Sequence, residues 1–259
     1  MPESFYELDG EQFVSTELTR GPWDPEFQHA GPPAALLGRE VERLEEAPDF
    51  QIVRITFEIL RAVPIAPLRA QAGIARPGRR VQLIEGSLHD AEGEVMRVTA
   101  WRIRTGEVEL PELPRPEPPP GPDEAEAGDF IPTGQKVGYH TAMEYRFLEG
   151  KFTEPGPAKV WMRMRCALVA GEQPTPLQRA LAAADSGNGV SVTLDWRRYL
   201  FINVDLSLHL ERMPEGEWVG LDAVTRPEPN GVGTADTLLF DQRGRIGRAL
   251  QSLLIAKRN

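Results

Sequence analysis

An acid and an amide, far apart in the sequence, occupy positions from which they could act together on a water molecule. Asp185 follows an apolar run of strong helix formers, residues 176–184. The last turn of a helix carries partial negative charge, which favours cations over a carboxylate. Asp185 is therefore either a solvated residue that begins a turn or a functional base that accepts a proton from water.

The amide is Gln251, which lies in the last predicted strand. It shares strand parity with Ala249 and Leu253, so the alternation turns it toward the apolar side. A buried amide without partners costs about 1–3 kcal/mol. We therefore expect Gln251 to have hydrogen-bond partners, with Asp185 as one candidate and a loop carbonyl as the alternative.

Asn203 is a second amide that could serve the same acid. It opens the alternating run 202–210, where its side chain could donate to a carboxylate and orient water or simply be solvated. Its parity places it on the polar side of that strand, whereas Gln251 lies on the apolar side of its own. The two can meet only at a bend, a bulge or a seam between two halves.

His29 and Gly31 stand where a loop enters the first predicted helix. The free N–H groups at a helix start suit an oxyanion, so we predict substrate binding near Gly31. His29 could contact a bound substrate, such as its phosphate, or it could only tie the loop.

The composition of the chain limits the classes of partner and cofactor that we expect for it. A net charge of −10 argues against nucleic acid, which needs clustered cations. The single cysteine, Cys166, excludes a disulfide framework, and the histidines lack metal-ligand spacing. There is no glycine-rich nucleotide loop, signal peptide or membrane-length apolar run. We expect a cytoplasmic protein with no metal, no cofactor and no membrane partner.

Hydrophobic periodicity predicts two helices, at 32–46 and 176–184, among many strands. The predicted strands are 4–8, 12–17, 55–59, 68–75, 81–89, 94–103, 139–147, 159–168, 202–210, 218–224, 237–240 and 245–255.

The second half of the chain repeats the order of the first. The apolar positions of 55–59 match those of 206–210 at a constant offset, which also maps Asp90 onto Asp241 and Gly93 onto Gly244. The segment 106–128 is rich in proline and acids and predicts an extended linker. We expect an α+β fold with repeats at 1–105 and 138–259, a linker at 106–137, and antiparallel sheets wrapped on one helix each.

Three stretches, PLQRALAAADSGNG, NVDLSLHLER and GRALQSLL, resemble the second half of the double hotdog acyl-CoA thioesterases. Residues 29–35 resemble the loop-to-helix entry of the same superfamily. The resemblance implies a double hotdog that hydrolyses an acyl-CoA or acyl-carrier thioester. It further implies that Asp185, Asn203 and Gln251 hold the attacking water, with Asn203 replacing the family's hydroxyl residue.

Other functions stay open at this level. A hotdog hydratase has a histidine closely after the helix aspartate, whereas residues 186–190 contain none. A binding protein that has lost turnover would keep the fold but not the chemistry. A serine hydrolase is excluded because no Gly-x-Ser-x-Gly occurs. The two fused repeats already form a pseudo-dimer, so a homo-oligomer is neither required nor excluded.

Overall fold

The computed structural model describes residues 3–44, 49–114, 116–128 and 133–258. The first part of the chain forms a hairpin, a helix and four long strands. These elements are β1 (Ser4–Asp9), β2 (Gln12–Ser15), the 3₁₀ turn η1 (Glu17–Thr19), α1 (Gly31–Glu42), β3 (Phe50–Ile59), β4 (Pro67–Arg76), β5 (Val81–Asp90) and β6 (Gly93–Arg104).

The second part has a similar order with more short elements. These are η2 (Pro122–Glu124), β7 (Glu126–Ala127), α2 (Tyr139–Ala142), β8 (Met143–Lys151), β9 (Glu154–Met164), β10 (Ala167–Val169), α3 (Pro176–Ala184), α4 (Gly187–Val190), β11 (Tyr199–Asn203), β12 (Asp205–Leu210), β13 (Trp218–Pro227), β14 (Val232–Asp241) and β15 (Gly244–Lys257).

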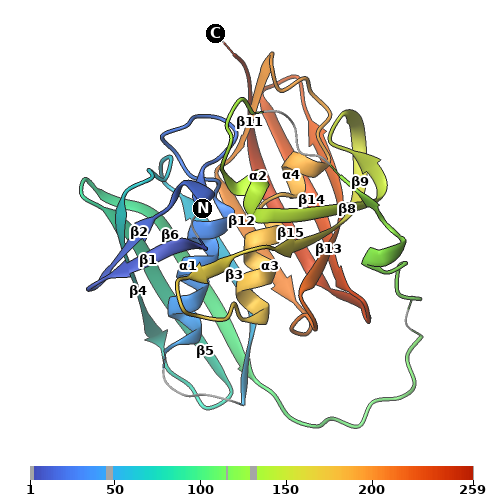
Figure 1. Ribbon diagram of the computed structural model, residues 1–259. Helices are drawn as coiled ribbons and strands as arrows, with labels where there is room; N and C mark the ends of the chain where they lie inside the picture. Colours follow the sequence, from blue (N-terminus) through green and yellow to red (C-terminus); the bar gives the residue numbers. More distant parts are fainter. Residues whose placement is uncertain (1–2, 45–48, 115, 129–132, 259) are drawn as a thin grey trace.

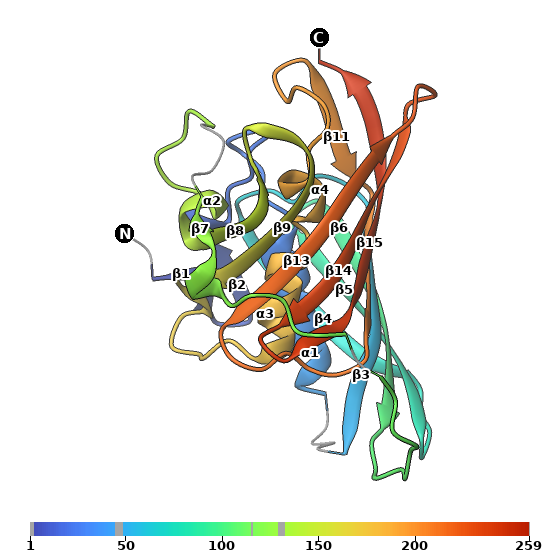
Figure 2. The same cartoon turned by 90° about the vertical axis from the view of Figure 1, so that its right-hand side faces the viewer.

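One sheet holds all fifteen strands of the described ranges. Its order is β10-β1-β2-β4-β5-β6-β3-β12-β15-β14-β13-β9-β8-β7, with β11 beside β15. Helices α1 and α3 lie side by side against one face of the long strands (Figure 1). Figure 2 shows them between those strands on one side and β1, β8 and β9 on the other. No helix of the described residues is long and apolar enough to cross a membrane.

The two halves join where β3 pairs antiparallel with β12. Phe57 faces Leu206 and Ile55 faces Leu208 across this junction. The constant sequence offset maps Ile55 onto Leu206 and Phe57 onto Leu208, so each residue faces the equivalent of the other. Equivalent strands therefore meet about an approximate two-fold. Asp90 and Asp241, also related by the offset, each pair with an arginine, Arg61 and Arg212.

Two glycines allow α1 and α3 to approach each other closely. A Cβ atom on Gly31 would stand 2.5 Å from the Ala182 carbonyl oxygen, and one on Gly38 would stand 2.3 Å from Cδ1 of Leu181. Leu181 and Leu177 on α3 are fully buried at this contact. Burial of each side chain contributes about 1.5–3 kcal/mol, so the helix pair is a central part of the core.

Four sequence predictions need correction. The first helix ends at Glu42 rather than near residue 46, which lies outside the described residues. Residues 139–142 form a helical turn before the strand. Of the residues described in the segment 106–128, those up to residue 121 are without helix or strand, but η2 and β7 follow and β7 pairs with β8.

The fourth correction concerns the alternating run 202–210, which is two strands rather than one. Asn203 pairs with Leu253 and Ser207 pairs with Leu250, so four steps along this run match three along β15. The extra residue is Val204, which is 51% exposed. Such a bulge reverses the faces to which the following side chains point.

Candidate active site

The carboxylate of Asp185 accepts hydrogen bonds from both predicted amides. Asn203 Nδ2 donates to Oδ1 over 2.9 Å, and Gln251 Nε2 donates to the same oxygen over 3.1 Å. The Asp185 side chain is only 4% exposed. A buried carboxylate is stabilised in its ionised form by such donors.

The local sequence explains why α3 delivers an acid to this point. Thr175 and Gln178 form a reciprocal capping box at its start, and Pro176 occupies the first turn. Asp185 caps its end, and residues 187–190 form another helical turn directly after it. Gly187 is required there for close approach, because a Cβ atom would stand 2.3 Å from Thr237 Oγ1.

The bulge at Val204 resolves the parity conflict between the two amides. Before the bulge Asn203 points to the same face as buried residues, and on β15 Gln251 is 3% exposed on the inner side. Asn203 also donates to the Asp205 carbonyl oxygen, so both its amide hydrogens have acceptors. The carbonyl oxygen of its side chain has no hydrogen bond to another described residue.

Gln251 is held on all sides by protein atoms. Its Nε2 also donates to the Asp185 backbone oxygen over 3.2 Å, and its Oε1 accepts from the Asn188 backbone N–H over 3.1 Å. It does not line the cavity described below. Gln251 therefore positions Asp185 and has no donor left for a water molecule.

His29 provides a third contact to the carboxylate. Its Nδ1 lies 2.9 Å from Asp185 Oδ2 and 3.1 Å from the Gly31 backbone nitrogen. One ring nitrogen carries either a proton or a lone pair, so it cannot donate to Asp185 and accept from Gly31 at once. With Asp185 ionised, the proton lies on Nδ1, and the Gly31 N–H loses this acceptor.

Tyr139 fixes the plane of the imidazole, and no feature of the sequence singled it out. The two rings stack with centroids 3.7 Å apart and an angle of 9°. The Tyr139 hydroxyl donates to the Ala182 carbonyl oxygen over 2.6 Å and lies 2.9 Å from Ser186 Oγ. Burial raises the pKa of Tyr139 well above its usual range, so it stays a neutral donor. Tyr139 thus connects His29 to the segment that carries Asp185.

A cavity of about 260 Å³ opens beside these polar groups. His29, Asp185 and Asn203 line one part of it. Apolar side chains make up much of the remaining wall, which also includes the polar residues Asp24, Gln28 and Ser186. The apolar ones are Trp23, Phe27, Ile59, Ala62, Val63, Phe152 and Ile202. Trp23 is held edge-on against Phe201 with centroids 4.8 Å apart. The cavity therefore offers an apolar chamber next to a carboxylate and an imidazole.

Two further residues bear on what this cavity can bind. Asn188 lines it, and its side-chain oxygen is buried without a hydrogen-bond partner among the described residues. Gly31 does not line it, so the predicted backbone donor lies just behind the wall formed by His29 and Ala30. Within the described ranges, no three histidine, cysteine or acidic side chains gather as metal ligands would.

Comparison with known families places this geometry in context. A model of the acyl-CoA thioesterase N-terminal domain matches residues 19–103, and one of the acyl-CoA thioesterase C-terminal domain matches residues 111–255. The second match alone covers more than half of the 259 residues. The chain belongs to the acyl-CoA thioesterase family and has its double hotdog fold. No curated protein matches the chain.

Solved structures share the fold at low sequence identity. A protein assigned as a thioesterase II in Thermobifida fusca is 15% identical, with a TM-score of 0.75 over 97% of this chain and 94% of that one. A hot dog protein of unknown function from Alicyclobacillus acidocaldarius is 16% identical, with a TM-score of 0.72 over 97% and 95%. The acyl-CoA thioesterase II TesB2 of Mycobacterium marinum is 14% identical, with a TM-score of 0.65 over 97% and 95%.

Proposed function

We propose that this protein hydrolyses acyl-CoA thioesters, with Asp185 and His29 together activating the attacking water. The observation that carries the proposal is the contact between Asp185 Oδ2 and His29 Nδ1 at the edge of an apolar cavity. Family membership supplies the substrate class. The apolar wall is suited to an acyl chain, and the polar end is suited to the thioester carbonyl.

Proton transfer in this proposal follows from the tautomer. The ionised carboxylate holds the proton on Nδ1, so Nε2 keeps a lone pair, and no described residue is hydrogen-bonded to it. Water donates a proton to Nε2 as its oxygen attacks the carbonyl carbon. The tetrahedral intermediate then expels the thiolate, which takes the proton from the imidazolium. The products are a carboxylic acid and free coenzyme A.

The amides have different parts in this scheme. Both hydrogens of the Gln251 amide point to Asp185, so Gln251 is a positioning residue. Asn203 also orients Asp185, and its side-chain oxygen remains available to accept a hydrogen bond from the water. The Gly31 N–H stays our predicted donor to the oxyanion, because the same tautomer releases it from His29.

The sequence-based alternative is that Asp185 takes the proton directly. Three donors already point to the carboxylate, which has about four acceptor directions, so one direction remains for water. In that mechanism His29 only orients the acid. The His29→Gln variant separates the two mechanisms: loss of the base costs about 10²–10⁴ in kcat, whereas loss of an orienting contact leaves most of the turnover.

A second candidate reaction is hydration of an enoyl-CoA. The sequence argued against it because no histidine follows Asp185, but the fold brings His29 from the other half to 2.9 Å from the acid. An acid–imidazole pair can also deliver water to a carbon–carbon double bond. A panel of saturated and 2-enoyl thioesters tests both reactions, with free thiol reporting hydrolysis and loss of enoyl absorbance reporting hydration.

Binding without release of thiol or loss of enoyl absorbance would instead indicate a non-catalytic acyl-CoA or acyl-carrier binding protein.

Three sequence predictions stay predictions: the repeat boundaries 1–105 and 138–259, the cytoplasmic location and any homo-oligomer. Expression of residues 138–259 alone, cell fractionation and light scattering would test them in turn.

A further inference from the structure

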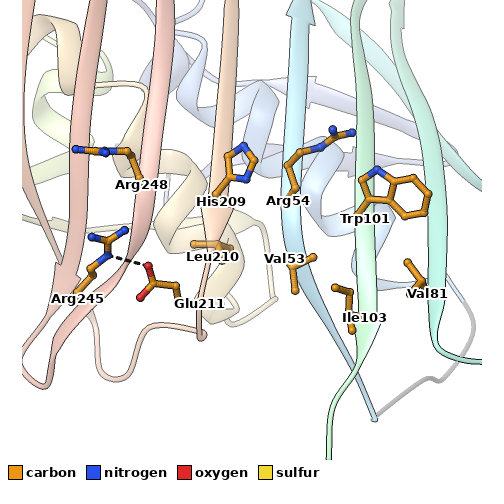
Figure 3. Close-up of a pocket in the computed structure, with 10 residues that line it drawn as sticks. All are labelled: Val53, Arg54, Val81, Trp101, Ile103, His209, Leu210, Glu211, Arg245 and Arg248. Atoms are coloured by element: carbon orange, nitrogen blue, oxygen red, sulfur yellow. Dashed lines mark ion pairs between the residues drawn. The ribbon is translucent and has the colours of Figure 1, made fainter. Parts of the chain in front are cut away.

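A second and larger hollow, of about 460 Å³, lies on the outer face of the sheet. Figure 3 shows its side chains on the side of the strands away from the helices. Val81, Trp101, Ile103, Val53 and Arg54 come from β5, β6 and β3. On the other side lie His209 and Leu210 of β12, Glu211 just after it, and Arg245 and Arg248 of β15. This outer groove therefore spans the β3–β12 junction, where the two halves of the chain meet.

Two arginines and a histidine lie in a row across this groove. Arg54 is directly opposite His209, which in turn is opposite Arg248 on the next strand. Arg248 pairs with Asp236 and Arg245 pairs with Glu211. Arg54 has no carboxylate partner among the described residues, and its Nε atom is buried without an acceptor.

Apolar side chains form the other part of the groove. A register shift in β3 between Ile52 and Arg54 brings both Val53 and Arg54 to the outer face. Trp101 is the direct cross-strand neighbour of Arg54, and Ile103 remains 42% exposed. An occupant that matches the groove would therefore carry both carboxylates and exposed aliphatic side chains.

The chain itself contains such a segment immediately after β6. Residues 106–113, GEVELPEL, place glutamates at 107, 109 and 112 among three aliphatic residues. These aliphatic side chains are among the most exposed of the molecule: Val108 at 74%, Leu110 at 67% and Leu113 at 59%. The segment is without helix or strand, so it can lie extended across a surface.

The two ends of this connection flank the groove. Ile103 lies on one side, just before the segment, and Pro118 lies against Gly244, next to Arg245, on the other. Crossing from β6 to β15 takes three inter-strand steps, or about 14 Å. Residues 105–117 can span up to about 40 Å when extended. The connection is therefore long enough to lie in the groove without moving either anchor.

In the structure residues 106–113 lie outside the outer groove, with their aliphatic side chains exposed. We propose that this segment moves into the groove and docks there as a strap across the β3–β12 junction. A glutamate pairs with Arg54, which has no carboxylate partner among the described residues, and the aliphatic side chains cover Trp101, Ile103 and Val53. The strap then joins the two halves by side-chain contacts as well as covalently. Because the groove and the acyl cavity are on opposite sides of the sheet, docking stabilises the fold and leaves turnover unchanged.

Disulfide trapping in the full chain tests this proposal. Leu110→Cys is combined with His209→Cys in the groove, and the matched control combines it with Ser252→Cys, which is exposed on β15 away from the groove. The one native thiol, Cys166, reacts slowly because burial raises its pKa to about 12. We expect an intramolecular bridge that forms at least about tenfold faster in the groove pair, because docking raises the effective concentration.

Two outcomes would overturn the proposal. Equal bridging rates for the two pairs would mean that the segment moves freely, and bridges between chains would mean that a second copy fills the groove. Maleimide labelling of the single variant Leu110→Cys gives a second measurement with an intact groove. Its thiol should react several-fold faster once Arg54→Gln and Arg248→Gln are added, and equal rates would reject docking.

Discussion

Replacing Asp185 by asparagine tests the acid–imidazole pair more sharply than deleting the side chain does. Asn203 Nδ2 and Gln251 Nε2 both donate to Oδ1, so the oxygen of the introduced amide must take that position. Its NH₂ group then occupies the position of Oδ2, 2.9 Å from His29 Nδ1. There it can only donate, which forces Nδ1 to accept and moves the imidazole proton to Nε2.

The expected loss follows from that change of tautomer. With its proton on Nε2, His29 has no lone pair directed at water and cannot act as a base. In serine proteases, the corresponding aspartate-to-asparagine change lowers kcat by about 10⁴ while leaving the geometry intact. We expect a similar loss here, equivalent to ~5 kcal/mol in the activation free energy. The variant should keep its fold because the shape and two of the three hydrogen bonds are retained.

The assay is release of free thiol from an acyl-CoA that the wild type hydrolyses, with circular dichroism and thermal melting as checks of folding. Asp195→Asn is the matched control, because Asp195 is exposed and bonds only its own turn. A folded Asp185→Asn variant that keeps more than about a tenth of wild-type kcat would refute the acid–imidazole mechanism. Loss in Asp185→Asn with near-normal turnover in His29→Gln would favour Asp185 as the direct base.

Three further predictions concern the support of the site. Gly31→Ala should lower the free energy of unfolding by about 1–3 kcal/mol and reduce turnover, because the new Cβ meets the Ala182 backbone oxygen; an unchanged denaturation midpoint would count against this packing. Tyr139→Phe should keep most of the activity and Tyr139→Leu should lose it, because only phenylalanine retains the stack on His29; equal kcat values in the two variants would contradict a positioning role. Burial raises the pKa of Glu42, so the folded state holds its proton more tightly and loses stability as the pH rises from about 4.5 through the folded-state pKa. Glu42→Gln should remove that decline and raise the melting temperature at pH 7, and an unchanged pH profile would be evidence against it.

Much of the fold was predictable because its signals are local. Alternation along β15 turned Gln251 inward, and the constant offset identified equivalent strands that pair at the β3–β12 junction. Helix propensity placed Asp185 at the end of α3. These signals depend on neighbours a few residues away, so the sequence alone carries them. Local signals failed at Val204. The run 202–210 alternates without a break, so its sequence gives no sign of the extra residue in the pairing with β15.

The sequence by itself determined which residues were available for chemistry: an acid after an apolar helix, an inward glutamine and a histidine before a helix. Only the tertiary structure decided which of them meet. His29 joins Asp185 because α1 and α3 pack closely at Gly31, and Tyr139 enters because α2 brings its ring onto the imidazole. Hydrogen bonds between segments so distant in the chain depend on how the two halves pack, and no periodicity within either half encodes that arrangement.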